Sequence, residues 1–231
     1  AIEKGHAEYF RQVNWWVLYR MLGLPRWLPR PGGGAMRRHE RNLRQTVHDL
    51  VLGRLGQAAG SEDLLGRLLA AKDPETGRSM PEERVVNNII AFLVAGYDTT
   101  ALALSWALYL IAQNSEWELK MRQEVERVAG DGPVTGEHLS KLVVVEQVLN
   151  EALRLYPTAP IIVRDFNEDV ELAGVKIPRG TIGLIPIYAI HRHRGFWSNP
   201  ETFDPERFAA DAPEKPNRYQ YLPFGAGPRI C

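Results

Sequence analysis

Residues 224–231 read FGAGPRIC, and this final stretch decides how the rest of the chain is interpreted. Cys231 is the only cysteine among 231 residues, so no disulfide can form within the chain. Gly225 and Gly227 allow the backbone to approach a large flat ligand closely. Arg229 is placed to pair with an acidic group on such a ligand. The loop therefore predicts a ligand site that includes one thiol.

The residues alone leave four explanations of the lone cysteine open. A single cysteine is most often an inert, small apolar side chain. As a nucleophile it needs a histidine base, and neither His191 nor His193 can be placed beside it from the sequence. As a zinc ligand it lacks the companion cysteines of a structural site, and the HRH run at 191–193 is a weak metal signal. As the sole protein ligand of a haem iron it needs no companions, because the porphyrin supplies four ligands.

Composition excludes several classes of partner and compartment. The 28 Lys and Arg residues balance the 28 Asp and Glu residues, so we expect neither nucleic acid nor an anionic membrane surface as a partner. The single cysteine favours a reducing compartment, and residues 1–10 show no signal-peptide pattern. We therefore expect a cytoplasmic protein, with membrane attachment through a segment outside this chain left open. Because the chain stops inside a glycine-rich loop, we expect a fragment of a longer protein.

An apolar run at 87–112, NNIIAFLVAGYDTTALALSWALYLIA, is long enough to cross a bilayer. Asp98 lies in its middle, and a carboxylate there costs about 2.5–3.5 kcal/mol on insertion scales. A helix buried inside a globular domain is equally apolar on all sides. We therefore expect a buried helix rather than a membrane span.

Hydrophobic periodicity and capping patterns predict a mostly helical chain followed by short strands. The expected helices are 7–22, 37–56, 62–71, 81–113, 115–129 and 141–156. The expected strands within 161–187 are Ile161–Arg164, Val170–Leu172, Val175–Ile177 and Thr181–Ile187. Residues 192–231 are expected to be mostly irregular. The predicted class is mainly α with a small β-sheet region.

Glu151 and Arg154 stand three residues apart on the helix expected at 141–156, so their side chains are neighbours. A solvated surface pair is one interpretation. That helix is apolar on two faces, however, which indicates burial, and a buried ion pair needs a further polar partner. Arg207, in the run FDPERF, is the candidate. We expect this triad to be architectural rather than catalytic.

The run AGYDTT at 95–100 places an acid beside a hydroxyl in an apolar helix. In one interpretation Thr99 bonds back to a helix carbonyl and Asp98 makes an ordinary pair. In the other, the helix opens locally at Gly96, a small ligand sits in the groove, and Asp98 and Thr99 relay protons.

Four runs in this order along the chain resemble the motifs of the cytochrome P450 family, the haem-thiolate monooxygenases. They are AGYDTT (95–100), EALR (151–154), PERF (205–208) and FGAGPRIC (224–231). The resemblance covers at least residues 85–231 and extends more loosely through the earlier helices. It implies a P450-like fold, truncated at both ends in this chain.

The resemblance also implies a role for each matching residue. Cys231 would be the axial ligand of haem b, Arg229 and Arg164 would bind its propionates, and Phe224 would lie against the ring beside the sulfur. The implied cofactor-binding residues are Arg164, Phe224, Gly225, Gly227, Arg229 and Cys231. The implied proton relay is Asp98 and Thr99, and the implied structural triad is Glu151, Arg154 and Arg207. Substrate contacts are assigned from position alone to Phe92, Ala95, Ile161 and Ile162.

The activity implied by the resemblance is insertion of one oxygen atom of O2 into a C–H bond of a small apolar substrate. Two electrons derived from NAD(P)H would arrive through a ferredoxin, a flavodoxin or a diflavin reductase, and Lys215 and Arg218 are candidate contacts for an acidic donor. A peroxide-using enzyme, a ligand sensor and an inactive haem-binding protein remain alternatives. The acid–alcohol pair favours the use of O2.

Overall fold

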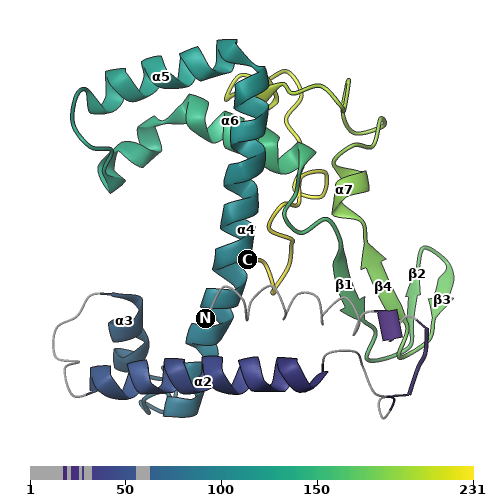
Figure 1. The fold of residues 1–231 in the computed structure, drawn as a ribbon. Helices are drawn as coiled ribbons and strands as arrows, with labels where there is room; N and C mark the ends of the chain where they lie inside the picture. The colour runs from purple at the N-terminus through teal and green to yellow at the C-terminus, as the bar shows by residue number, and fades with distance from the viewer. Residues whose placement is uncertain (1–17, 20–21, 26–27, 29–32, 56–62) are drawn as a thin grey trace. The chain divides into compact units, whose positions relative to one another are not determined.

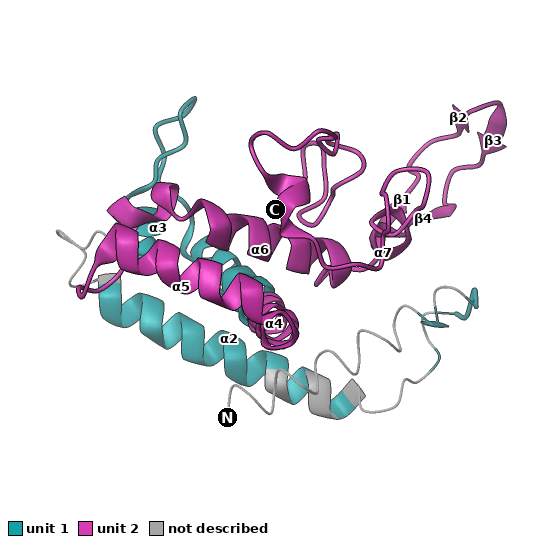
Figure 2. Ribbon diagram, turned by 90° about the horizontal axis from the view of Figure 1, so that it is seen from above, with its two compact units in different colours: residues 1–97 teal, residues 98–231 magenta. Residues whose placement is uncertain are grey.

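The computed structural model describes residues 18–19, 22–25, 28, 33–55 and 63–231, so most of the helix expected at 7–22 lies outside the described residues (Figure 1). The chain divides into two compact units, residues 1–97 and residues 98–231 (Figure 2). Each unit has a hydrophobic core of its own and is described separately.

In the first unit, helix α2 (Gly33–Leu55) and helix α3 (Leu64–Ala70) pack with the first turns of helix α4 (Glu82–Gln113). The core consists of four valines from α2 and α4, which are Val47, Val51, Val85 and Val86. The two α2 valines stand four residues apart and therefore share one face of the helix. Asp63 caps α3, because its carboxylate accepts a hydrogen bond of 2.8 Å from the Gly66 amide.

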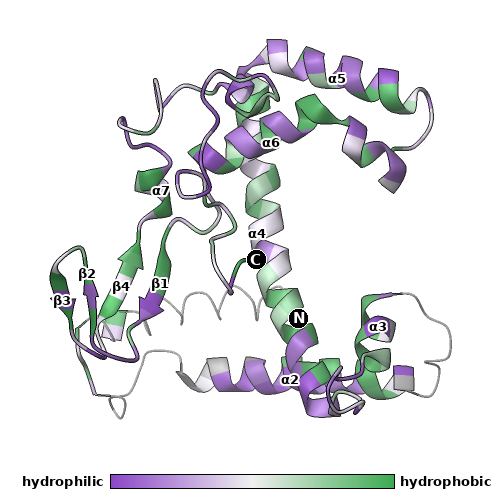
Figure 3. Ribbon diagram, turned by 180° about the vertical axis from the view of Figure 1, so that it is seen from behind, coloured by the Kyte–Doolittle hydropathy of each residue, from purple (hydrophilic) through white to green (hydrophobic). Residues whose placement is uncertain are grey.

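Helix α4 continues without interruption across the boundary between the units, and its middle is exposed in this chain. Of the helices in the described residues, it alone is long and apolar enough to cross a membrane (Figure 3). None of its apolar 18-residue window is buried, so the expectation of a buried helix is wrong for this chain. The reason is that buried contacts form near its two ends, at Val85 and Val86 and at Ala107 and Leu110.

In the second unit, helix α5 (Ser115–Ala129) is followed by a 3-10 turn η1 (Gly136–Lys141) and helix α6 (Val143–Leu155). Figure 1 shows α5 and α6 lying side by side. The last turns of α4 pack against α6 through a core of Ala107, Leu110, Ala152 and Leu155. Beside this core, the rings of Trp106 and Tyr156 stack with their centroids 4.1 Å apart.

Two antiparallel strand pairs follow α6 (Figure 1). Strand β1 (Ile162–Asp165) pairs with β4 (Ile182–Ile185), and β2 (Val170–Leu172) pairs with β3 (Val175–Ile177). The turn between β2 and β3 places Ala173 and Gly174 at positive φ, as a tight two-residue hairpin requires.

Beyond β4 the chain forms the short helix α7 (Ile187–Ile190), the 3-10 turn η2 (Pro205–Phe208) and loops. The expected fold class, mainly α with a small β-sheet region, is confirmed, and both strand pairs are antiparallel.

Candidate functional site

Glu151 and Arg154 form a fully buried ion pair on α6, with both side chains at 0% exposure. The Arg154 Nε donates to Glu151 Oε2 at 2.6 Å, and a terminal nitrogen donates to Oε1 at 2.8 Å. The remaining N–H groups of Arg154 reach three main-chain carbonyls, those of His191 at 2.8 Å, Pro200 at 2.7 Å and Thr202 at 3.1 Å. All five guanidinium N–H groups therefore have an acceptor, which is the condition for burying this cation at acceptable cost.

The Glu151 carboxylate has further partners beyond Arg154. It accepts a hydrogen bond of 2.9 Å from the Asp204 amide, and Arg207 Nε lies 3.5 Å from Oε1. Burial raises the pKa of the Glu151 carboxyl above its usual range, while the hydrogen bonds from Arg154 oppose that shift. The structure thus brings together the three residues that the sequence analysis grouped, Glu151, Arg154 and Arg207.

This cluster ties α6 to the loop segment 191–204. Four hydrogen bonds run from the two α6 side chains to main-chain groups of that segment. Trp197 covers the Arg154 guanidinium with its ring centroid 5.1 Å away. Because the segment lacks regular secondary structure over most of its length, these contacts and its own turn hydrogen bonds fix its path.

His191 is a buried residue that the sequence analysis missed as part of this arrangement. Its ring has 0% exposure, Nδ1 lies 3.2 Å from the Arg154 carbonyl oxygen, and Nε2 lies 2.8 Å from the Leu222 amide nitrogen. A carbonyl only accepts and an amide only donates, so Nδ1 carries the proton and Nε2 accepts. Burial lowers the pKa of His191 to about 4, which keeps the ring neutral. In the sequence, His191 is one histidine of an HRH run, with no local sign of its partners.

The final loop, residues 222–231, follows that contact directly. Its amides fold the loop on itself, with Gly225 donating to the Leu222 carbonyl at 3.1 Å and Cys231 donating to the Phe224 carbonyl at 3.0 Å. Gly225 has φ +76°, and an added Cβ there would lie 3.3 Å from Ile162 Cδ1. The structure therefore places the loop against β1, which also carries Arg164.

The expected ligand groups of the final loop are accessible. The Cys231 thiol is free and exposed, and the Phe224 ring is 54% exposed. Arg164 and Arg229 are also exposed, and Arg164 donates to its neighbour's carbonyl, that of Val163, at 2.9 Å. The final loop and β1 thus present a thiol, an apolar ring and two cations in the same unit.

The run AGYDTT (95–100) lies on a regular stretch of α4. The helix is α-helical at every residue from Glu82 to Gln113, so the local opening expected at Gly96 is not seen. Hydroxyl side chains fit such a helix without opening it, as Ser105 shows by donating to the Ala101 carbonyl at 2.8 Å. Thr99 and Asp98 belong to the second unit, four and three residues after Ala95 on the same helix.

The proposed substrate contacts are divided between the units. Phe92 and Ala95 are exposed residues of α4 in the first unit. Ile161 and Ile162 lie at the start of β1 in the second unit, where Ile161 is exposed and Ile162 is half-buried against Gly225. The i, i+3 spacing of Phe92 and Ala95 places both on one face of the helix.

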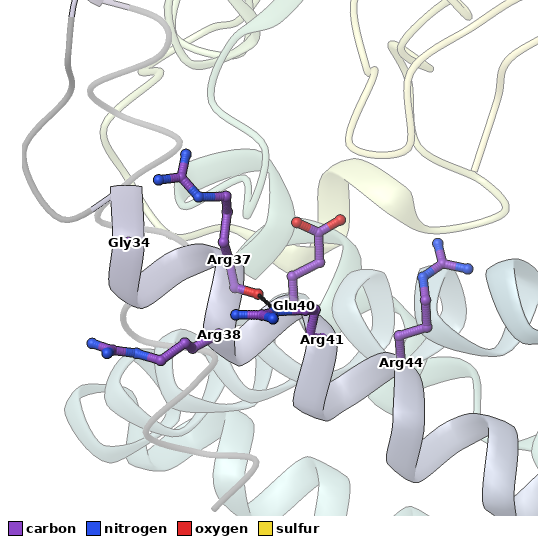
Figure 4. A pocket seen from close by; sticks show the side chains of 6 residues that line it. All are labelled: Gly34, Arg37, Arg38, Glu40, Arg41 and Arg44. Carbon is purple, nitrogen blue, oxygen red and sulfur yellow. Dashed lines mark hydrogen bonds between the residues drawn. The ribbon is translucent and has the colours of Figure 1, made fainter.

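A hollow of about 660 Å³ lies elsewhere, along α2. Its lining residues are Gly34, Arg37, Arg38, Glu40, Arg41 and Arg44 (Figure 4). Arg44 donates to the Asn87 side chain at 2.8 Å, and Arg41 donates to the Arg37 carbonyl at 3.3 Å. None of the site residues expected from the sequence lines it.

A family model described as Cytochrome P450 matches residues 3–231. The chain belongs to the cytochrome P450 family. The cyclooctat-9-en-7-ol 5-monooxygenase of Streptomyces melanosporofaciens is 35% identical to it over 210 residues, which cover 91% of this chain and 46% of that relative.

Two solved P450 structures share the fold. The heme domain of cytochrome P450DA has a TM-score of 0.79 at 32% identity, covering 85% of this chain and 44% of that one. The retinoic acid-bound cyanobacterial CYP120A1 has a TM-score of 0.80 at 31% identity, covering 88% and 48%. The family and the P450-like fold expected from four short motifs are confirmed, and the chain spans about half the length of these relatives.

The residues of this P450 chain fit the haem that the family implies. Cys231 carries a free and exposed thiol. A single thiolate would suit an iron whose four other ligands come from a porphyrin. The exposed Phe224 ring and the Arg164 and Arg229 guanidiniums suit an apolar ring with acidic substituents.

Proposed function

We propose that this chain carries the thiolate side of a haem-thiolate monooxygenase site, which inserts one oxygen atom of O2 into a C–H bond of a small apolar substrate. The observation that carries the proposal is the free, accessible thiol of Cys231 at the end of a loop fastened to the buried core of the second unit. When bound, a haem iron with a thiolate ligand supplies the activation of O2. The residues of the chain then hold the cofactor, the substrate and the protons.

Cofactor binding is assigned to the final loop and β1. Cys231 provides the sulfur ligand, while Arg164 and Arg229 neutralise the propionates. Phe224 contributes an apolar face next to the sulfur, where a ring tunes the electron density of the ligand. Gly225 and Gly227 adopt φ of +76° and +80°, a conformation that side chains disfavour, and so keep the loop open to a flat ligand.

Proton delivery is assigned to Asp98 and Thr99 on α4. A carboxylate followed by a hydroxyl can take a proton from solvent and hand it on through one short hydrogen-bonded step. The accessibility of the pair supports this assignment, because Asp98 is half-buried and Thr99 is exposed on α4, so the carboxylate can take up a proton from solvent.

The substrate is assigned to the apolar class. The exposed residues Phe92, Ala95 and Ile161 and the half-buried Ile162 offer hydrophobic contacts and no charge. Two relatives support that class, since one is named for its action on cyclooctat-9-en-7-ol and the other was solved with retinoic acid bound. Two electrons would come from NAD(P)H through a ferredoxin, flavodoxin or diflavin reductase, with exposed Lys215 and Arg218 as contacts for an acidic surface.

The test is the spectrum of the reduced, carbon monoxide-bound holoenzyme. We expect the strongly red-shifted Soret band of a thiolate complex, and we expect Cys231→His to replace it with the band of imidazole-ligated haem. A wild-type spectrum that already resembles imidazole ligation would contradict the proposal. So would a Cys231→His spectrum identical to that of the wild type.

A further inference from the structure

His191 joins two main-chain segments that are far apart in the sequence. Through Nδ1 it holds the Arg154 carbonyl of α6, 37 residues earlier, and through Nε2 it holds the Leu222 amide, 31 residues later. Its own carbonyl accepts from the Arg154 guanidinium at 2.8 Å. Besides the bond that its amide donates to the Ile187 carbonyl, this residue therefore makes two hydrogen bonds to Arg154 and one to the first residue of the final loop.

The rings around His191 leave it little freedom to move. Tyr221 stacks on the imidazole with its centroid 5.4 Å away, and Trp197 approaches edge-on at 6.5 Å. Trp197 is itself held by a hydrogen bond of 3.2 Å from its Nε1 to the Ile190 carbonyl. The Tyr221 hydroxyl donates to the Asn150 carbonyl of α6 at 2.9 Å. The imidazole is thus clamped between elements that are each anchored to α6 or α7.

The Leu222 amide, which His191 accepts from, is connected to Cys231 through the backbone and the hydrogen bonds of the final loop. Leu222 and the following Pro223 are buried, whereas the loop is mostly exposed from Phe224 onward. The Leu222 carbonyl accepts from Gly225, and the Phe224 carbonyl accepts from Cys231. A displacement of the Leu222 main chain therefore passes to Cys231 through two consecutive loop hydrogen bonds.

We propose that His191 is a positioning residue for the thiolate ligand, because it fixes the main chain of the final loop at Leu222 to α6 at Arg154. The inference rests on the proposed function of Cys231. A histidine that only filled the core would stabilise the fold without affecting the ligand. A positioning histidine also determines how well the sulfur is held as a thiolate.

Two conservative substitutions separate the two ring contacts of His191. In His191→Asn, the amide nitrogen takes the place of Nδ1 and can still donate to the Arg154 carbonyl, but the side chain is too short to reach Leu222. In His191→Gln, the longer side chain brings its amide oxygen to the place of Nε2, where it can accept from the Leu222 amide. The matched control is His193→Asn, because His193 is exposed and lies two residues further on.

The readout is the carbon monoxide spectrum of each reduced holoenzyme, together with amide hydrogen exchange in the final loop. For His191→Asn we expect most of the haem to lose the thiolate band and amide exchange at Leu222 to rise about tenfold or more. We expect His191→Gln to retain most of the thiolate band and the control to match the wild type. An Asn variant that is merely less stable, with an intact thiolate band, would overturn the inference.

Measurements on the wild-type holoenzyme alone still test the inference in two further cases. If neither variant folds, amide exchange at Leu222 decides, because a hydrogen-bonded amide must be protected as strongly as the amides of α6. If the Leu222 amide exchanges as fast as an unprotected loop amide, the hydrogen bond between His191 and Leu222 is refuted. If the wild type lacks the thiolate band altogether, the proposed function fails, and protection at Leu222 still reports whether His191 holds the loop.

Discussion

At the scale of single residues, Arg154 is a fully buried side chain whose five N–H groups all have an acceptor. We expect Arg154→Lys to lower the free energy of unfolding by about 3–5 kcal/mol, because a lysine keeps the charge but cannot reach all of these acceptors. Urea unfolding of the variant measures this loss. The control is Arg122→Lys, since Arg122 is 74% exposed in its pair with Glu118 and should show no measurable change. Equal stability of both variants would contradict the architectural role of the buried pair.

The neutral state of His191 predicts how stability depends on pH. Because burial lowers its pKa from 6.5 to about 4, the unfolded chain binds a proton that the folded chain does not. The stabilisation is fully present above pH 6.5 and is lost as the pH falls towards about 4, a loss of about 3 kcal/mol. Urea midpoints measured between these pH values should fall less steeply for His191→Gln than for the wild type. Parallel curves would show that His191 does not titrate in this way.

The adjacent hydroxyls of α4 allow a matched test of the proton relay. We expect Thr99→Ala in the holoenzyme to retain haem but to slow product formation about 100-fold, while oxygen is still consumed and released as peroxide. The measurement is the ratio of product to NAD(P)H oxidised. Thr100→Ala, which removes the neighbouring hydroxyl, should keep that ratio. If both variants couple as well as the wild type, Thr99 has no part in the relay.

At the scale of elements, the N-terminus of helix α6 is capped by a carboxylate from another helix, α5. The buried side chain of Glu124, on α5, accepts from the Val144 and Val145 amides at 2.9 and 3.0 Å. These amides have no acceptor within α6 because they lie in its first turn. Glu124 therefore replaces a local cap and also ties α5 to α6.

We expect Glu124→Ala to lower the free energy of unfolding by about 1–2 kcal/mol, because two amides at the start of α6 lose their acceptor. Thermal or urea unfolding measures the loss. Glu126→Ala, two residues further on the same helix and exposed, is the matched control and should leave stability unchanged. A loss of equal size in both variants would contradict the capping role of Glu124, since alanine is the better helix former and helix propensity predicts no loss in either variant.

The same comparison of elements shows what the sequence could predict. Helix positions follow from periodicity and from breakers such as Pro157, which are local signals, so the helix expected at 115–129 is observed at Ser115–Ala129. Glu124 as the cap of α6 could not be predicted, because its partners lie 20 and 21 residues away. The burial of α4 was inferred from its apolar composition and from Asp98 in its middle, and neither feature shows whether other elements cover a helix.

At the scale of the whole molecule, the site depends on contacts between distant segments rather than on any one motif. The triad of Glu151, Arg154 and Arg207 was predictable, since a buried pair needs a further partner and few arginines lie among apolar residues. His191 was not, because its two ring contacts join residues 37 and 31 positions away and each partner is a main-chain group, which leaves no trace in side-chain patterns.

Because each unit has a separate core, a substitution in one core should lower the local stability of that unit more than that of the other. Val51 is fully buried in the core of the first unit, and Val51→Ala removes two methyl groups from it, which costs about 1–3 kcal/mol. Leu50→Ala is the control, since Leu50 is 56% exposed on the same helix. Hydrogen exchange followed by peptide should show the largest increase for Val51→Ala in α2 and α3, and little change for Leu50→Ala. A uniform increase over α2, α3 and α6 would instead show that both cores open in one cooperative step, since local openings are confined to the contacts that a substitution weakens.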